Sequence, residues 1–152
     1  GLNSNSAQGD RAAAWLLPEL TRKALAIDAS DIPDLVPILS VAAACFQGAT
    51  FTNIRRLRLK ESDRVASVIA MLEVLGGHAE ADDNTLHIFG TGLVGGTVDS
   101  VNDHRIAMSA AIAAIRCTEP VTILGAQCVQ KSYPKFFDEY RRLGGRYEQY
   151  LR

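Results

Sequence analysis

The stretch Leu57-Arg58-Leu59-Lys60-Glu61-Ser62-Asp63-Arg64 decides how the rest of the chain is interpreted. From Lys60 to Arg64 it places two bases, two acids and a hydroxyl in five consecutive residues, between a strand-like segment at 49–54 and an apolar helical pattern that begins at Val65. A charge run of this kind can be a solvated surface. A helix start, however, offers free backbone N–H groups and the positive end of the helix dipole. The stretch therefore predicts an anion site at a helix N-terminus.

The composition is that of an ordinary globular domain. The chain has 152 residues, of which 47% are hydrophobic and 22% charged, and its net charge is −1. This charge provides no field for nucleic acid or a membrane surface, and no apolar run approaches the roughly 20 residues that span a bilayer. Cys45, Cys117 and Cys128 are widely spaced, which favours small buried hydrophobes over disulfides or metal ligands. We expect a cytoplasmic protein with no metal, nucleic-acid or membrane partner.

Hydrophobic periodicity predicts alternating helices and strands. The helical patterns at 35–46 and 106–115 are apolar on every face, so we expect both helices to be buried on every side. Ser62 is the expected N-cap of the helix that begins at Val65, and Pro18 is expected to kink or split the first helix. The predicted helices are 10–23, 35–46, 65–75, 106–115 and 136–143, and the predicted strands are 24–28, 49–54, 78–81, 85–89, 97–101, 120–124 and 146–151.

The chain contains an internal repeat. One block of apolar helix, strand, polar turn, amphipathic helix, Leu-Gly-Gly and strand begins at Asp34 and again at Asp103. Within it, Leu75-Gly76-Gly77 matches Leu143-Gly144-Gly145. We interpret the blocks as duplicated βαβαββ units within one α/β domain. Because the segment from residue 8 into the first helix matches the second half of such a unit, we expect the chain to begin inside a larger protein.

The repeat predicts where the functional residues gather. If the copies pack around a local symmetry axis, their equivalent helix starts converge on one face. So many bases in a chain of net charge −1 indicate an anionic ligand, since arginine binds carboxylate and phosphate through paired hydrogen bonds. Acids among bases suit proton transfer, because neighbouring charges tune their pKa values. The residues expected on this face are Lys60, Arg64, Arg105 and Lys131, with Asp34, Glu61 and His104 among them.

Four stretches of the chain form a set of motifs in a fixed order: Ile32-Pro33-Asp34-Leu35, the Leu57–Arg64 stretch, Asn102-Asp103-His104-Arg105-Ile106-Ala107-Met108, and Lys131-Ser132-Tyr133-Pro134 with Phe136-Phe137. Through these motifs the chain resembles, from about residue 8 to 145, the 5-enolpyruvylshikimate-3-phosphate synthase family. This resemblance implies a two-domain, inside-out α/β barrel fold, in which each domain holds three βαβαββ units with helices inside and sheets outside. The chain, residues 1–152, would be the C-terminal part of one such domain, with the N-terminal domain and the start of this one absent.

The resemblance also implies a reaction. The family transfers the enolpyruvyl group of phosphoenolpyruvate to the 5-hydroxyl of shikimate 3-phosphate and releases phosphate, with no cofactor or metal. Carried over by motif, Asp34 would accept the proton of the attacking hydroxyl and hold the acceptor ring. Glu61 would handle the proton at the methylene carbon of phosphoenolpyruvate, and Lys60 would contact shikimate 3-phosphate.

The remaining motif residues would bind the second substrate. Arg64, Arg105 and Lys131 would hold phosphoenolpyruvate, and His104 would support the proton network. The family often has a substrate-binding asparagine four residues before the motif lysine. Here that residue is Arg56, so the contact is not carried over.

Two alternatives stay open at this point. A UDP-N-acetylglucosamine enolpyruvyl transferase would share the fold and the reaction, although the motifs at 60–64 and 102–105 favour the shikimate family. A non-catalytic, anion-binding half-domain is the second alternative, because the family's active site lies between two domains. We therefore expect the fragment alone to have little or no turnover.

Overall fold

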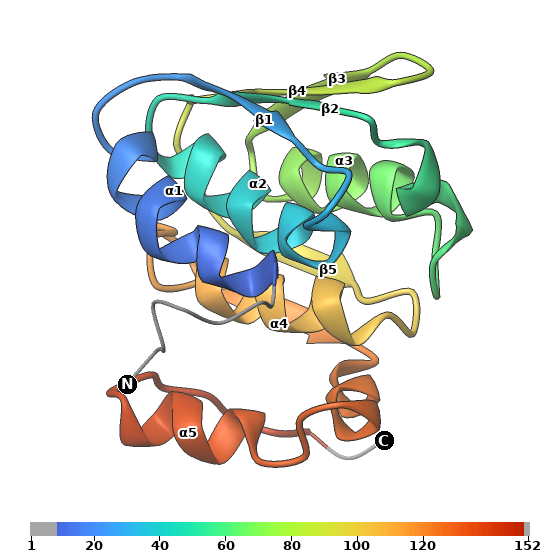
Figure 1. Ribbon diagram of the computed structural model, residues 1–152. Coiled ribbons are helices and arrows are strands. Elements are labelled where there is room, and N and C mark those ends of the chain that lie inside the picture. Colours follow the sequence, from blue (N-terminus) through green and yellow to red (C-terminus); the bar gives the residue numbers. More distant parts are fainter. Residues whose placement is uncertain (1–8, 151–152) are drawn as a thin grey trace.

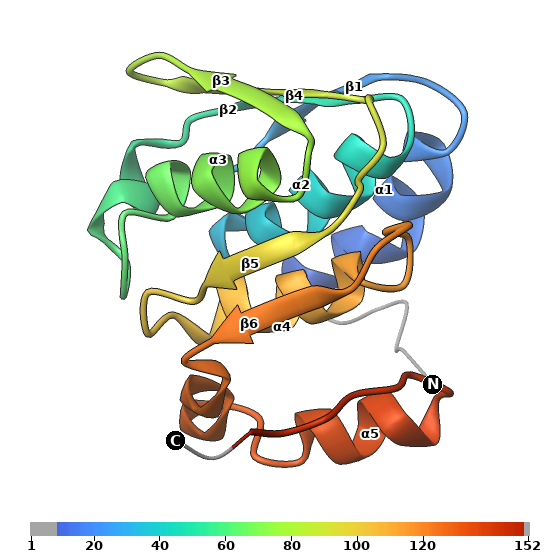
Figure 2. The same ribbon diagram turned by 180° about the vertical axis from the view of Figure 1, so that it is seen from behind.

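The computed structural model describes residues 9–150. Helices form the inside and sheets the outside. A four-stranded sheet lies across the top of the first three helices in Figure 1, and Figure 2 shows a two-stranded sheet on the other side of the helices. The helices are α1 (Ala13–Leu20), α2 (Val36–Cys45), α3 (Arg64–Val74), α4 (His104–Ala113) and α5 (Phe136–Arg142). The strands are β1 (Leu25–Asp28), β2 (Ala49–Thr52), β3 (His78–Ala81), β4 (Thr85–Phe89), β5 (Gly96–Asp99) and β6 (Val121–Leu124).

The internal repeat is visible in the strand pairing. β1 pairs with β2 in parallel across α2, and β5 pairs with β6 in parallel across α4. The carboxylates that end the first strands, Asp28 and Asp99, each accept a hydrogen bond from the backbone N–H two residues further on. The two βαβ halves are therefore built alike. In the first copy the hairpin of β3 and β4 adds to the free edge of β2, which gives the order β1-β2-β4-β3.

The two Leu-Gly-Gly turns close their helices with the same hydrogen bonds. Gly77 donates its N–H to the carbonyl of Leu72 at 2.8 Å, and Gly145 donates to Tyr140 at 2.9 Å. The first glycine of each pair has a positive φ, 83° at Gly76 and 99° at Gly144, a backbone conformation that favours glycine. The match predicted from sequence is thus confirmed down to the backbone.

The predicted strand at 146–151 is wrong for residues 146–150, which form no strand, while Leu151 lies outside the described residues. The side chain of Tyr147 packs back on α5 instead. Its ring lies 5.1 Å from that of Phe137 and 4.4 Å below the guanidinium of Arg141. Aromatic and cation–π contacts hold the segment against the helix.

The core lies between α2 and α4, which pack against each other. Seven residues of α2 and seven of α4 are buried, and many of them are alanines, which let the two helices approach closely. The sequence prediction of two buried helices is confirmed for α2 and α4, but the predicted second helix included Ile115, which lies beyond the end of α4 and is exposed. No helix among residues 9–150 is both long and apolar enough to cross a membrane.

Two local predictions need correction. The first helical segment is a 3₁₀ turn at Gly9–Ala12 followed by α1, which Pro18 does not split and which ends at Leu20. Ser62 is not the cap of α3. Asp63 is the N-cap, since its carboxylate accepts hydrogen bonds from the N–H groups of Val65 and Ala66, both at 3.1 Å.

Candidate functional site

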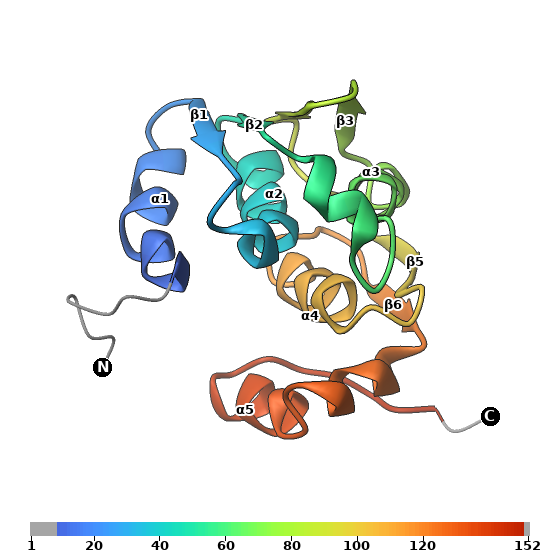
Figure 3. The ribbon, with the colours of Figure 1, turned by 45° about the vertical axis from the view of Figure 1, so that its right-hand side comes forward.

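The starts of α2, α3 and α4 lie together at the right-hand side of the molecule in Figure 1, and Figure 3 shows the same end turned forward. A 3₁₀ turn at Pro33–Leu35 leads into α2, and another at Arg55–Leu59 precedes α3. Pro37 lies in the first turn of α2, where its missing N–H costs nothing. The packing of the three helices brings their charged first residues together, as the repeat predicted.

Arg64, the first residue of α3, is the centre of the site. Its side chain is only 1% exposed, and each of its nitrogens reaches a different carboxylate. Nε lies 2.9 Å from Asp103, Nη1 lies 2.6 Å from Asp34, and Nη2 lies 2.6 Å from Glu61. The planar guanidinium therefore holds three acids from three helix starts in fixed positions.

Asp34 connects this buried centre to solvent. Its carboxylate lies 2.6 Å from Arg64, 3.3 Å from the Lys60 ammonium and 3.6 Å from Nη2 of Arg105. The Asp34 side chain is still 41% exposed. A carboxylate that three cations surround and solvent still reaches can receive a ligand.

Asp103 lies on the opposite side of Arg64 and is fully buried. Its carboxylate caps α4 by accepting the N–H of Arg105 at 2.9 Å, and it also accepts the hydroxyl of Ser62 at 3.0 Å. The sequence analysis did not predict the contacts of Asp103 with Ser62 and Arg64. No sequence signal marks them, because the partners are 41 and 39 residues away along the chain.

Electrostatics keep the site ionised. Burial by itself raises the pKa of Asp34, but the hydrogen bond from Arg64 and the charges of Arg105 and Lys60 outweigh it, so the pKa lies below its ordinary value. For Asp103 burial is likewise outweighed by the hydrogen bonds from Arg64 and from the backbone N–H of Arg105, and its pKa is also lowered. Burial lowers the pKa of Arg64, but its carboxylate partners raise it above the ordinary value. All three groups are charged at neutral pH.

The side chains of the other predicted residues, Lys131 and His104, lie near the start of α4. Lys131 donates a hydrogen bond to the backbone carbonyl of Asn102 at 2.8 Å, and within residues 9–150 it makes no ion pair with the acids around Arg64. His104, the first residue of α4, is buried. Within the described part of the chain, Nδ1 of His104 and Nε of Arg105 are buried without a hydrogen-bond partner. The structure thus gathers Asp34, Lys60, Glu61, Arg64 and Arg105 into one network, with two donors or acceptors still free beside it.

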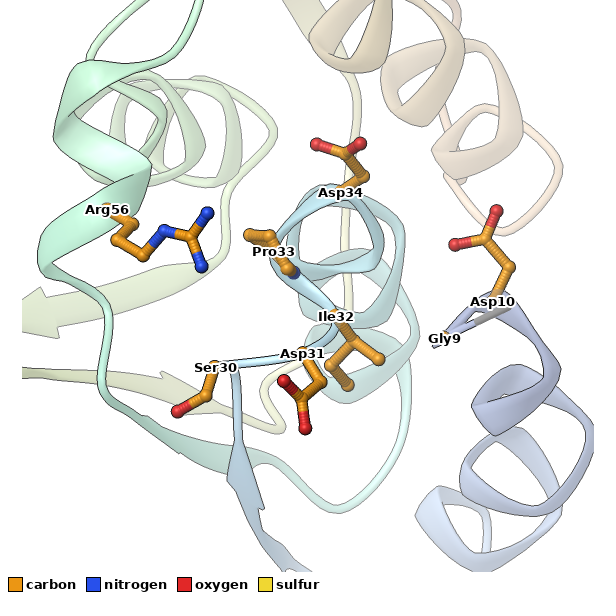
Figure 4. A pocket seen from close by; sticks show the side chains of 8 residues that line it. All are labelled: Gly9, Asp10, Ser30, Asp31, Ile32, Pro33, Asp34 and Arg56. Carbon is orange, nitrogen blue, oxygen red and sulfur yellow. The ribbon is translucent and has the colours of Figure 1, made fainter. Parts of the chain in front are cut away.

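Asp34 also borders a hollow of about 310 Å³, seen from close by in Figure 4. Arg56 extends across it toward the turn that carries Pro33 and Asp34. The residues that line the hollow are Gly9, Asp10, Ser30, Asp31, Ile32, Pro33, Asp34 and Arg56. Among residues 9–150, no group of three or more His, Cys, Asp or Glu side chains is arranged to hold a metal ion.

The fold and the site together define a class, the α/β enolpyruvyl transferases, in which repeated βαβαββ units carry a charged site at their helix starts. The chain belongs to the EPSP synthase (3-phosphoshikimate 1-carboxyvinyltransferase) family, whose family model matches residues 7–140. The family predicted from the sequence motifs is thereby confirmed.

Comparison with individual relatives shows how much of a family member this chain covers. The 3-phosphoshikimate 1-carboxyvinyltransferase of Clostridium acetobutylicum is 45% identical over 160 aligned positions, which cover 95% of this chain and 37% of that protein. The enzyme of the same name from Clostridium perfringens is 47% identical over 78% of this chain and 28% of its own length. An EPSP synthase structure from Acinetobacter baumannii superposes with a TM-score of 0.70 at 31% identity, covering 77% of this chain and 28% of that one. The chain therefore spans less than two fifths of the length of these relatives.

Proposed function

We propose that the chain is part of a 3-phosphoshikimate 1-carboxyvinyltransferase, which transfers the enolpyruvyl group of phosphoenolpyruvate to the 5-hydroxyl of shikimate 3-phosphate and releases phosphate. The proposal places this reaction in aromatic amino-acid biosynthesis in the cytoplasm. The observation that carries it, beside family membership, is the Asp34 carboxylate, which three bases from the starts of α3 and α4 surround while 41% of the side chain stays exposed.

The transfer needs a group that takes the hydroxyl proton. An ionised carboxylate beside the hollow is suited to accept a hydrogen bond from the attacking hydroxyl of the acceptor. The cations that lower the pKa of Asp34 make it a weak base in the free protein. When Arg105 and Lys60 turn to bind substrate anions, Asp34 loses part of this stabilisation and becomes a stronger base. Substrate binding and proton acceptance would then be coupled.

The transfer also needs a proton at the methylene carbon of phosphoenolpyruvate. Protonation there makes the adjacent carbon electrophilic, and the acceptor oxygen bonds to that carbon. Loss of a proton from the same methyl carbon then accompanies departure of phosphate and restores the double bond. Glu61 is suited to this task, because its side chain is 45% exposed and Nη2 of Arg64 holds it at 2.6 Å. Asp34 and Glu61 are thereby carried by neighbouring nitrogens of one guanidinium.

The substrates carry carboxylate and phosphate groups, which the remaining bases would bind. We assign Lys60 to shikimate 3-phosphate, and Arg105 and Lys131 to phosphoenolpyruvate, with His104 supporting the proton network. Arg64 is assigned to phosphoenolpyruvate as well, and in the free protein its nitrogens are bound to Asp34, Glu61 and Asp103. The start of α4 adds backbone donors and a favourable dipole.

We propose further that residues 1–152 form the C-terminal part of one domain and hold only part of the active site. The missing N-terminal domain of the same polypeptide would complete it. The coverage of 28–37% of the relatives supports this division.

The test uses the full-length polypeptide that contains this chain and measures phosphate release from phosphoenolpyruvate. Shikimate 3-phosphate and UDP-N-acetylglucosamine are supplied as acceptors in parallel. We expect turnover with shikimate 3-phosphate alone. Turnover with only the UDP-sugar would make the protein the related transferase, and no turnover with either would remove the proposed function.

The isolated 152-residue chain is tested separately. We expect little or no phosphate release and weak binding of phosphoenolpyruvate, seen by NMR as shifts of the backbone amides at 103–106. Full activity of the isolated chain would show that the site is complete without a second domain.

A further inference from the structure

We propose that Asp103 is a positioning residue, which fixes the orientation of Arg64 and thereby the relative positions of the Asp34 and Glu61 carboxylates. The inference rests on the proposed function, because it assigns proton transfer to those two acids. Asp103 is not among the residues that line the hollow, and the hydrogen bonds around its buried carboxylate support the inference.

Asp103 makes more contacts than a helix cap requires. Its Oδ1 accepts the N–H of Arg105 at 2.9 Å, which completes the cap of α4. Its Oδ2 accepts Nε of Arg64 at 2.9 Å and the hydroxyl of Ser62 at 3.0 Å, both from the stretch that opens α3. The carboxylate therefore ties the helix starts of the two repeat copies together.

Asp63 shows what a cap alone looks like. It caps α3 through the N–H groups of Val65 and Ala66, its side chain is 41% exposed, and its only ion pair within residues 9–150 is a 3.3 Å contact with Arg58. Asp103, in contrast, is fully buried. Burying a carboxylate is costly unless it is paired and hydrogen-bonded. The hydrogen bonds from Arg64, the backbone N–H of Arg105 and Ser62 together compensate the burial of Asp103, and of these three donors only Arg64 carries a charge.

The contact decides where the guanidinium points. Arg64 is held at Nε by Oδ2 of Asp103, and Nη2 lies 3.4 Å from Oδ1 of the same carboxylate. This leaves Nη1 directed to Asp34 and Nη2 to Glu61. Without Asp103 the guanidinium can rotate toward its two remaining partners, and the spacing of those partners is no longer set. A displacement of about 1 Å at reacting groups can cost about 100-fold in rate.

The experiment compares Asp103→Asn with Asp63→Ala in the full-length polypeptide. Asp103→Asn keeps the shape and removes the charge that holds Arg64, while Asp63→Ala removes the neighbouring helix cap and leaves Arg64 untouched. We expect Asp103→Asn to lower kcat by about 100-fold, with KM for shikimate 3-phosphate changed by less than about threefold. Asp63→Ala should lower Tm by about 2–4 °C and leave kcat within about twofold. A wild-type kcat in folded Asp103→Asn, or an equal loss in Asp63→Ala, would overturn the inference.

Two further measurements keep the inference testable if Asp103→Asn does not fold or the wild type does not turn over. Ser62→Ala removes one donor to Oδ2, and we expect a roughly fivefold loss of kcat at unchanged Tm, whereas an unchanged kcat speaks against positioning. In the 152-residue chain, the Nε–H resonance of Arg64 reports the contact without any reaction. It should lose protection from exchange in Asp103→Asn and keep it in Asp63→Ala, and the reverse pattern would reject the inference even if the proposed function also failed.

Discussion

Asp34 and Arg105 face each other from the strand-to-helix junctions of the two copies of the repeat. Each lies six residues beyond the aspartate that ends the first strand of its copy. Nη2 of Arg105 is 3.6 Å from Oδ2 of Asp34. The corresponding junctions of the two copies thus place opposite charges face to face at the site.

The first prediction concerns Asp34. Asp34→Asn in the full-length polypeptide keeps the side-chain volume but removes the group proposed to accept the hydroxyl proton. We expect kcat for phosphate release to fall by about 1,000-fold. Asp31→Asn is the matched control, since Asp31 lines the same hollow outside the network of Arg64, and its kcat should stay within about threefold of the wild type. Equal losses in the two variants would contradict a specific role for Asp34.

The second prediction concerns the stability that Arg64 supplies. Arg64→Ala leaves three carboxylates without their shared cation, one of them fully buried. Removing one partner of a buried charge network costs about 3–5 kcal/mol of unfolding free energy. Urea unfolding of the 152-residue chain measures this loss.

Arg55→Ala is the control for that measurement. Arg55 pairs with Asp83 on the surface, where the side chains are 71% and 77% exposed. Such pairs contribute about 0–1 kcal/mol. If the two substitutions cost the same, the network around Arg64 does not stabilise the fold.

The third prediction concerns acid. Because the pKa values of Asp34 and Asp103 are lowered in the folded protein, the unfolded chain binds more protons as the pH falls below about 5. The stability these groups provide is complete above their unfolded pKa values of about 3.9 and is lost as the pH drops through the lower folded values. We expect the urea midpoint to fall from pH 5 to pH 3, and to fall less steeply in Asp103→Asn. Equal slopes would mean that Asp103 does not contribute to acid sensitivity.

The fourth prediction uses the repeat as its own control. Gly76→Ala and Gly144→Ala each place a side chain on a residue of positive φ, which costs about 1–2 kcal/mol. At Gly144 an added Cβ meets nothing within 4 Å, but at Gly76 it comes within 3.0 Å of Cγ2 of Val94. We expect Gly76→Ala to cost more unfolding free energy than Gly144→Ala, measured by urea unfolding. Equal costs would show that the loop at Val94 moves aside freely.

The sequence predicted the repeat, the buried helices and the convergence of their starts, because these follow from period, turn chemistry and duplication. Lys60, Arg64 and Arg105 indeed meet around Asp34. The sequence did not predict that Arg64 is buried, since burial depends on side-chain contacts between residues 30 to 39 positions apart. The sequence analysis also predicted Ser62, and not Asp63, as the N-cap of α3. Both residue types are good N-caps, and only the tertiary hydrogen bond from Ser62 to Asp103 distinguishes their roles.

The fold also offers a place for engineering. The helices α3 and α1 are followed by connections of very different length. The connection from α3 to β5 comprises residues 75–95 and includes the hairpin of β3 and β4, whereas the connection from α1 to β1 comprises only residues 21–24. All four of these linking residues are exposed, and they lie at the end of β1 remote from Asp28 and the helix starts. The architecture therefore accommodates a segment of hairpin size at this point, and a fluorescent reporter or an affinity tag can be inserted at residues 21–24 while the network around Arg64 stays intact.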